Sequence, residues 1–182
     1  MLIDDLDRLP ECFKDGYRGV MLLHRNKDGE TGNAQRKAYK IITNGVNAWY
    51  DAIERLSYLR MTGYRDYRIY SSVNPRNMRK AIHEFKRRQL QAAYDHNDDY
   101  DFYTDIENRF FSSAMSPVCR DHSLFLIDCD SEHEYEKAID MIPKDLVVFD
   151  YETRNGRHII TKPFNPNEIP ITINKDGLIS IC

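Results

Sequence analysis

The sequence predicts an α+β fold in which a mostly antiparallel sheet, with a helix on one face, follows an α/β unit. Short apolar runs bounded by turn-forming residues predict strands in both halves of the chain. Stretches with helical spacing of apolar residues lie between these runs. In the second half the predicted order is strand, helix, strand, strand. Two hairpin signals in that half favour antiparallel pairing.

Composition places the chain among globular proteins with a sizeable core. It has 182 residues, of which 41% are hydrophobic and 30% charged, and its formal net charge is −3. A nearly neutral chain is not basic throughout, so any anion-binding surface must be local. The four cysteines are widely spaced, and this spacing indicates neither a zinc site nor a disulfide framework.

Nothing in the sequence predicts export or membrane insertion. The acidic N-terminus lacks the basic flank and apolar core of a signal peptide. No apolar run approaches the roughly 18 residues that a membrane-spanning helix needs. We therefore expect a reducing, cytoplasmic setting and no membrane partner.

The first half is predicted to contain strands at residues 19–24 and 67–73 and a helix at residues 44–58. Trp49, on the apolar stripe of that helix, is expected to anchor the core rather than to stack on a base. Residues 25–40 are polar, with glycines near their start, and are predicted to form a loop.

A basic helix is predicted after the second of these strands. Asn74 and Pro75 suit the N-cap and the first helical position. The cations around its apolar stripe are Arg76, Arg79, Lys80, Lys86, Arg87 and Arg88. Cations at a helix N-terminus oppose the helix dipole, and a bound phosphate would relieve that mismatch. The helix either contacts phosphate or nucleic acid, or presents an ordinary solvated face.

An acidic, tyrosine-bearing connection follows at residues 95–105. The abrupt change of charge sign makes it the best candidate for a boundary between two halves. We place the halves at residues 1–111 and 112–182, within what is expected to be one compact domain.

The second half opens with an apolar strand that ends in the sequence Asp128-Cys129-Asp130. Ser131 and Glu134 form a capping-box pattern that predicts a helix as far as about residue 142. Further strands are predicted at residues 146–151, 157–161, 171–174 and 178–181. The turn signals Asn155-Gly156 and Asp176-Gly177 are expected to join them in pairs as hairpins.

The acidic pair is the first candidate for chemistry. Alternate residues of a strand share a face, so Asp128 and Asp130 should point the same way. Mg²⁺ prefers oxygen ligands, and it would relieve the repulsion between the two carboxylates. The alternative is a strand end followed by a helix cap, supplied by Asp130 or Ser131.

A histidine on a later strand is the second candidate. The hairpin at residues 155–156 could bring His158 beside the acidic pair. Most strand histidines are structural, but beside a metal-bound nucleotide an imidazole can stabilise a phosphate oxygen. Lys162 would share the face of His158 if the strand stays regular, whereas Arg157 alternates to the other face.

These residues resemble the first two motifs of the archaeo-eukaryotic primase superfamily, which includes primase-polymerases. The first motif there is an acidic pair on a strand, as in Phe-Leu-Ile-Asp128-Cys-Asp130. The second is a small or polar residue, any residue and then histidine, as in Gly156-Arg157-His158. The resemblance covers about 40 of the 182 residues.

The resemblance implies an RRM-like catalytic half preceded by an α/β unit, in a minimal or divergent member of the superfamily. Asp128 and Asp130 would bind Mg²⁺ or Mn²⁺, and His158, with Arg157 and Lys162, would contact nucleotide phosphates. A third carboxylate normally follows on a later strand, and Asp176, in a predicted turn, is the candidate here. A chain of this size would suit phage or mobile-element replication, with nucleic acid, nucleoside triphosphates and other replication proteins as partners.

Three functions therefore remain open. The first is a divalent-metal-dependent nucleotidyltransferase of primase-polymerase type that acts on nucleic acid. The second is a non-catalytic nucleic-acid- or protein-binding module with the same fold. The third is a metal-dependent nuclease that uses the acidic pair to activate water.

Overall fold

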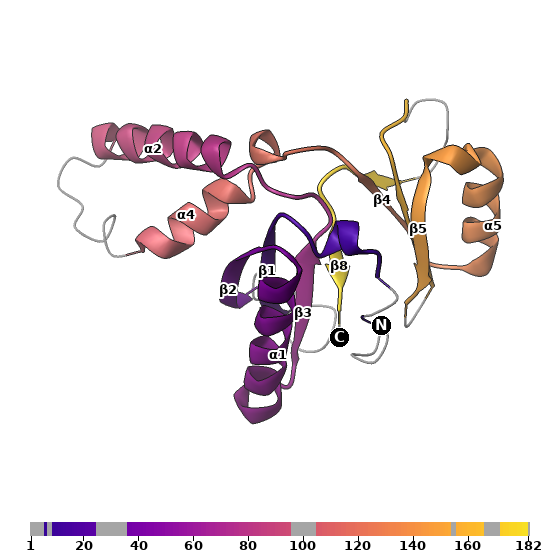
Figure 1. Cartoon of the computed structure of the whole chain (residues 1–182), viewed down its shortest axis with the longest axis horizontal. Coiled ribbons are helices and arrows are strands. Elements are labelled where there is room, and N and C mark those ends of the chain that lie inside the picture. The colour runs from indigo at the N-terminus through magenta and orange to yellow at the C-terminus, as the bar shows by residue number, and fades with distance from the viewer. Residues whose placement is uncertain are drawn as a thin grey trace.

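The protein is described from a computed structural model, which covers residues 6, 9–24, 36–95, 105–153, 156–165 and 172–181. Within these residues it is an α+β protein with two four-stranded antiparallel sheets and four α-helices. Figure 1 shows helices α2 and α4 on one side of the molecule and helix α5 on the opposite side.

The first sheet has the strand order β2-β1-β3-β8. Its strands are β1 (Tyr17–His24), β2 (Arg36–Asn44), β3 (Tyr67–Ser72) and β8 (Leu178–Ser180). Strand β2 starts within the stretch that the sequence predicts to be a loop, so that prediction is wrong from residue 36 onward. Among the described residues, strand β2 pairs with β1 alone and forms the edge of the sheet. An edge strand tolerates lysines and other polar residues, which hide the strand pattern.

The second sheet has the strand order β5-β6-β4-β7. Its strands are β4 (Phe125–Cys129), β5 (Val147–Glu152), β6 (Arg157–Thr161) and β7 (Ile173–Asn174). Helix α5 (Glu132–Met141) packs on one face, over Ile127, Cys129 and Ile159. The predicted antiparallel sheet with a helix on one face is confirmed.

The last two strands do not form the predicted hairpin. Strand β7 pairs with β4 in the second sheet, whereas β8 pairs with β3 in the first. The turn at Asp176 and Gly177 therefore carries the chain from one sheet to the other. Since β8 completes a sheet of the first half, the division at residues 111 and 112 does not follow the sheets.

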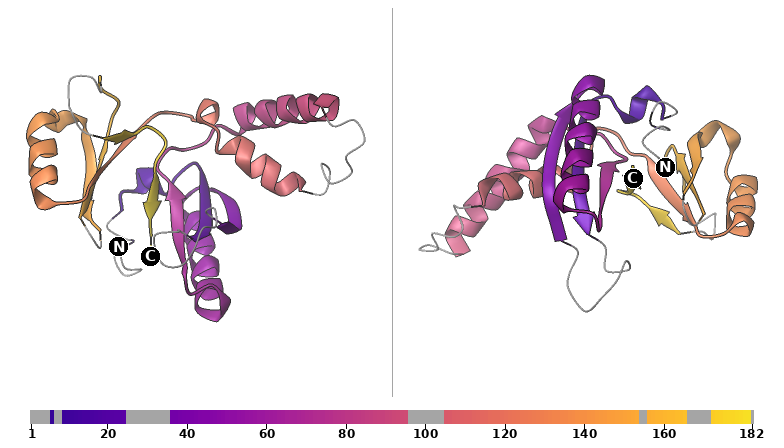
Figure 2. Two further views of the ribbon diagram at one scale, coloured as in Figure 1. Left: turned by 180° about the vertical axis from the view of Figure 1, so that it is seen from behind. Right: turned by 90° about the horizontal axis from the view of Figure 1, so that it is seen from below.

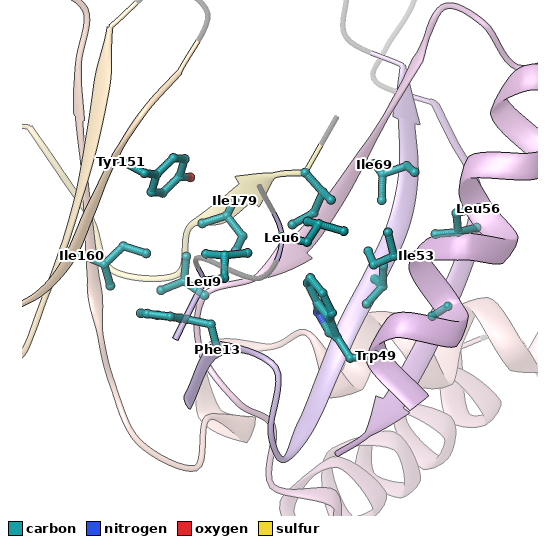
Figure 3. Packing of buried hydrophobic residues seen from close by; sticks show 14 of the residues in the cluster. Leu6, Leu9, Phe13, Trp49, Ile53, Leu56, Ile69, Tyr151, Ile160 and Ile179 are labelled. Atoms are coloured by element: carbon teal, nitrogen blue, oxygen red, sulfur yellow. The ribbon is translucent and has the colours of Figure 1, made fainter. Parts of the chain in front are cut away.

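The main core lies between the two sheets and is closed by helix α1 (Val46–Gly63) (Figure 3). Trp49 is fully buried there, as predicted, and its indole N–H donates to Ser71 Oγ at 3.0 Å. From the second sheet, Leu126, Tyr151 and Ile160 pack into the same cluster. Because this core is continuous, the two sheets share one buried interior.

Helices α2 (Met78–Asp95) and α4 (Ile106–Ala114) pack against each other through Phe85 and Phe110. Figure 2 shows this pair extending away from the two sheets in both views. The predicted start of α2 is wrong. Asn74 is buried and accepts the Leu124 N–H at 2.6 Å. Asn77 caps the helix instead, accepting the Lys80 N–H at 3.1 Å.

Most of the acidic connection at residues 95–105 lies outside the described residues. Short 3₁₀ turns at Glu11–Phe13, Pro117–Cys119 and Lys144–Leu146 link the remaining elements. No helix in the described part of the chain is long and apolar enough to cross a membrane.

Candidate nucleotide and metal site

Asp128 and His158 occupy directly paired positions of two adjacent strands, β4 and β6. Leu126, two residues before Asp128, pairs with Ile160, two residues after His158. Leu126 and Ile160 belong to the core between the sheets. Strand alternation therefore puts Asp128 and His158 on the face opposite helix α5.

The two side chains are in contact. His158 Nε2 lies 2.9 Å from Asp128 Oδ1. The histidine side chain is 13% exposed and the aspartate side chain 51% exposed. The pair thus has a mostly buried base and an aspartate that solvent, and therefore an incoming ligand, can reach.

The other imidazole nitrogen is held by a tyrosine that sequence reasoning missed. Tyr151 Oη lies 2.7 Å from His158 Nδ1, and the two rings meet edge to face. Tyr151 pairs with His158 across strands β5 and β6. Burial raises the pKa of the Tyr151 hydroxyl, and the charge of Asp128 adds to the increase.

Asp130 lies one residue beyond the end of β4 and is exposed. The capping box predicted from the sequence forms beside it. Ser131 Oγ accepts the Glu134 N–H at 3.2 Å, and Glu134 Oε2 accepts the Asp130 N–H at 2.9 Å. Ser131, rather than the Asp130 carboxylate, caps helix α5, so the side chain of Asp130 is not needed for that purpose.

Gly156 allows the backbone of the β5-β6 connection to approach the end of β4. A Cβ atom at this position would lie 2.0 Å from the Cys129 carbonyl oxygen and 3.1 Å from Asp130 Cα. Only glycine fits so close to another backbone. Gly156 therefore fixes the distance between the histidine strand and the acidic pair.

Negative charge is concentrated at this end of β4. Burial raises the pKa of the Cys129 thiol to about 11, and Glu134, Asp128 and Asp130 add to the increase. The Cys129 side chain is buried among apolar residues against helix α5, where a charged thiolate is disfavoured, and the nearby carboxylates disfavour it further. The same carboxylates attract a cation.

Arg157 lies on the other face of the sheet, as its alternation with His158 predicts. Its guanidinium contacts Asp150 at 2.8 Å and sits 3.9 Å above the Tyr135 ring centre. Tyr135 also donates to Asp150 at 3.0 Å. This cluster ties helix α5 to the sheet and leaves Arg157 away from Asp128.

The structure does not bring Lys162 or Asp176 to the acidic pair. Lys162 follows Thr161, which pairs with Phe125 at the far end of β4, and its Nζ donates to the Asp145 carbonyl. Asp176 lies in the turn after β7, where it accepts from Arg76 at 2.8 Å and from Asn74 at 3.2 Å. The Arg120 Nε lies 3.8 Å from the same carboxylate.

The six cations that the sequence assigns to the basic helix divide into three groups. Arg76 precedes the helix and is 2% exposed, so it is a structural partner of Asp176 rather than a surface cation. Arg87 and Arg88 form ion pairs with Glu84 at 2.9 and 2.7 Å. The remaining exposed cations of the helix are Arg79, Lys80 and Lys86. The sequence therefore overstates the positive surface.

The described residues contain no cluster of three or more His, Cys, Asp and Glu side chains arranged to hold a metal. No family model matches the chain, and no curated protein or solved structure matches it.

Proposed function

We propose that the protein is a divalent-metal-dependent nucleotidyltransferase of primase-polymerase type, and that Asp128, Asp130 and His158 form its nucleotide site. The observation that carries this proposal is the direct contact of Asp128 with His158 at paired positions of β4 and β6. Asp128 and His158, 30 residues apart in sequence, thus meet on one face of one sheet.

The residues at the end of β4 suit Mg²⁺ or Mn²⁺. Mg²⁺ in nucleotide enzymes is commonly held by one or two carboxylates, with water and substrate phosphates completing its coordination. Asp128 and Asp130 are both exposed and stand in a field of negative charge. A site of two carboxylates completed by the triphosphate requires no third protein ligand, so the engagement of Asp176 elsewhere is compatible with it.

Each residue then has a separate task. Asp128 and Asp130 would hold the metal, which supplies charge neutralisation at the phosphates and activation of the attacking hydroxyl. His158 would donate from Nε2 to a phosphate oxygen, a contact that stabilises the charge developing during phosphoryl transfer. Gly156 would maintain the spacing between these groups.

The topology of the second sheet supports the RRM-like catalytic half that the primase resemblance implies. Its strands and helix follow the order β-α-β-β along the chain, which begins the β-α-β-β-α-β pattern. The pattern is incomplete, because none of the described residues between β6 and β7 is helical.

The test is nucleotide incorporation by the purified chain. Primed and unprimed single-stranded templates would be incubated with labelled ribo- or deoxynucleoside triphosphates and Mg²⁺ or Mn²⁺. Incorporation by the wild type and its loss in Asp128→Asn and His158→Ala would support the proposal. Asp140→Asn, on the exposed side of α5, is the matched control and should retain activity. Incorporation that persists in both site variants would refute it.

The second candidate is a non-catalytic nucleic-acid-binding module, favoured by the exposed cations Arg79, Lys80 and Lys86 on helix α2. Phosphate contacts by lysine and arginine release counterions, so affinity should fall steeply with salt. This candidate predicts salt-sensitive oligonucleotide binding that is indifferent to divalent metal and unaffected by Asp128→Asn.

A further inference from the structure

We propose that Tyr151 is a positioning residue for His158, and that its hydroxyl acts with Asp128 to hold the imidazole in the tautomer whose Nε2 carries the proton. The catalytic consequence rests on the proposed function, but the tautomer is a property of the protein alone. Tyr151 belongs to none of the sequence motifs described above.

The donor and acceptor roles follow from the partners on each side of the ring. An ionised carboxylate can only accept hydrogen bonds. Asp128 Oδ1, at 2.9 Å, therefore requires a proton on His158 Nε2. In a neutral imidazole the second nitrogen is then an acceptor. Tyr151 Oη, at 2.7 Å from Nδ1, must be its donor.

Burial makes Tyr151 a fixed donor. The residue is 8% exposed and packs in the core between the two sheets. Figure 3 shows its ring on the side of the second sheet that faces the first. Phe149 stacks on the Tyr151 ring, with centroids 5.7 Å apart. The Tyr151 hydroxyl lies 2.7 Å from His158 Nδ1, so the packed ring directs its hydroxyl at that nitrogen.

The Tyr151 hydrogen bond determines which nitrogen of His158 can donate to a ligand. A histidine that contacts phosphate through Nε2 needs the proton there, and a free imidazole divides its proton between two nitrogens. A hydrogen bond to one nitrogen selects the proton position on the other. Tyr151 would thus prepare the Nε2–H donor before a nucleotide arrives, with Asp128 accepting it in the meantime.

Imidazole ¹⁵N chemical shifts measure this directly. We would record two-bond ¹H–¹⁵N spectra of the full chain, without metal, at neutral pH. The wild type should show a pyrrole-like Nε2 and a pyridine-like Nδ1 for His158. In Tyr151→Phe the Nδ1 resonance should move because that nitrogen loses its hydrogen-bond donor. In Tyr151→Phe combined with Asp128→Ala, where neither partner of the ring remains, the two nitrogen shifts should converge as the tautomers mix. Tyr135→Phe removes a hydroxyl from the opposite face and should leave both nitrogens unchanged.

Two results would overturn the proposal: a wild-type His158 protonated at Nδ1, or His158 nitrogen shifts that are identical in wild type and Tyr151→Phe. The wild-type spectrum decides the tautomer even if the variant fails to fold. In the incorporation assay, loss of the hydroxyl should lower activity by about 10–100-fold, as expected for a group that orients a functional histidine. If the wild type incorporates no nucleotide, the proposed function fails while the nitrogen shifts still decide the role of Tyr151.

Discussion

The Asp128 carboxylate and the His158 imidazole meet at 2.9 Å because β4 and β6 pair these two residues directly. The contact places an exposed acid against a mostly buried base, at the end of the strand where negative charge gathers. Because Ser131 caps helix α5, variants of Asp130 can distinguish a metal-binding role from a structural role.

Replacing Asp130 by Asn or Ala should change the free energy of unfolding by no more than about 0.5 kcal/mol, as at most exposed positions. Ser131, not Asp130, caps helix α5. Stabilisation by Mg²⁺ or Mn²⁺ should disappear, since a ligand that binds only the folded state is what raises the melting temperature. Thermal unfolding with and without metal measures both effects.

Ser131→Ala is the matched control for Asp130. Loss of the cap should cost about 0.5–2 kcal/mol while the metal-dependent shift remains. If Mg²⁺ or Mn²⁺ still raises the melting temperature of Asp130→Ala, Asp130 is not a metal ligand.

Gly156→Ala should destabilise the chain by about 1–3 kcal/mol, the usual cost of forcing an extra carbon into a packed region. The added Cβ would meet the Cys129 carbonyl oxygen at 2.0 Å. Gly63→Ala is the comparison, because a Cβ there has no neighbour within 4 Å. That change should be neutral or stabilising, since Gly63 ends helix α1. Equal denaturant midpoints for the two variants would show that Gly156 does not set the spacing.

Asp176→Ala should destabilise the protein without affecting metal binding. Arg76, its partner, has a side chain that is 1% exposed, and a buried charge left alone costs about 3–5 kcal/mol. Because the Asp176 side chain is 19% exposed, we expect the lower end of that range. Urea unfolding measures the loss of stability, and metal titration measures whether metal binding is retained. Loss of the metal-dependent shift in a variant that remains folded would restore Asp176 as a third ligand.

Glu84→Gln should strengthen binding to a labelled single-stranded oligonucleotide. Hydrogen bonds from Arg87 and Arg88 hold the pKa of Glu84 at about 2, so the carboxylate is charged at any pH suitable for a binding assay. Its removal frees two cations, and the salt dependence of the affinity should steepen by about one to two contacts. Arg79→Gln should do the reverse. If neither variant changes the binding, helix α2 is an ordinary solvated face.

Local patterns predicted the strand that contains Asp128 and the helix that follows it, because such patterns depend on apolar runs and helix capping alone. The four consecutive apolar residues before Asp128 predicted a buried strand, and the Ser131-x-x-Glu134 pattern located the start of α5. Both features follow from geometry within a few residues. No knowledge of the partner strands was needed.

Tyr151 was missed because its role depends on hairpin register. A two-residue turn at positions 155 and 156 would pair His158 with Thr153. The observed connection is longer, with the Thr153 N–H donating to the Gly156 carbonyl at 2.8 Å, and it pairs His158 with Tyr151. Register shifts of this kind change the partners of every residue, and sequence periodicity does not report them.

Arg76 and the last strands were misjudged because their partners are distant in sequence. In the sequence Arg76 has the features of a surface cation. Its partner, Asp176, lies 100 residues away and is not evident from the local pattern. Similarly, β7 and β8 flank a good turn signal but pair with β4 and β3. Which strand each of them pairs with is determined by packing in the shared core, not by the local turn.

The most direct test of the central claim is a titration of the full chain with Mn²⁺ and a nucleoside triphosphate, followed by NMR. A paramagnetic ion held by Asp128 and Asp130 should broaden the imidazole resonances of His158 before those of the other histidines, and Asp128→Asn should abolish this selectivity. Broadening that leaves His158 sharp, or that is unchanged in Asp128→Asn, would contradict the assignment of a metal-nucleotide site to this pair.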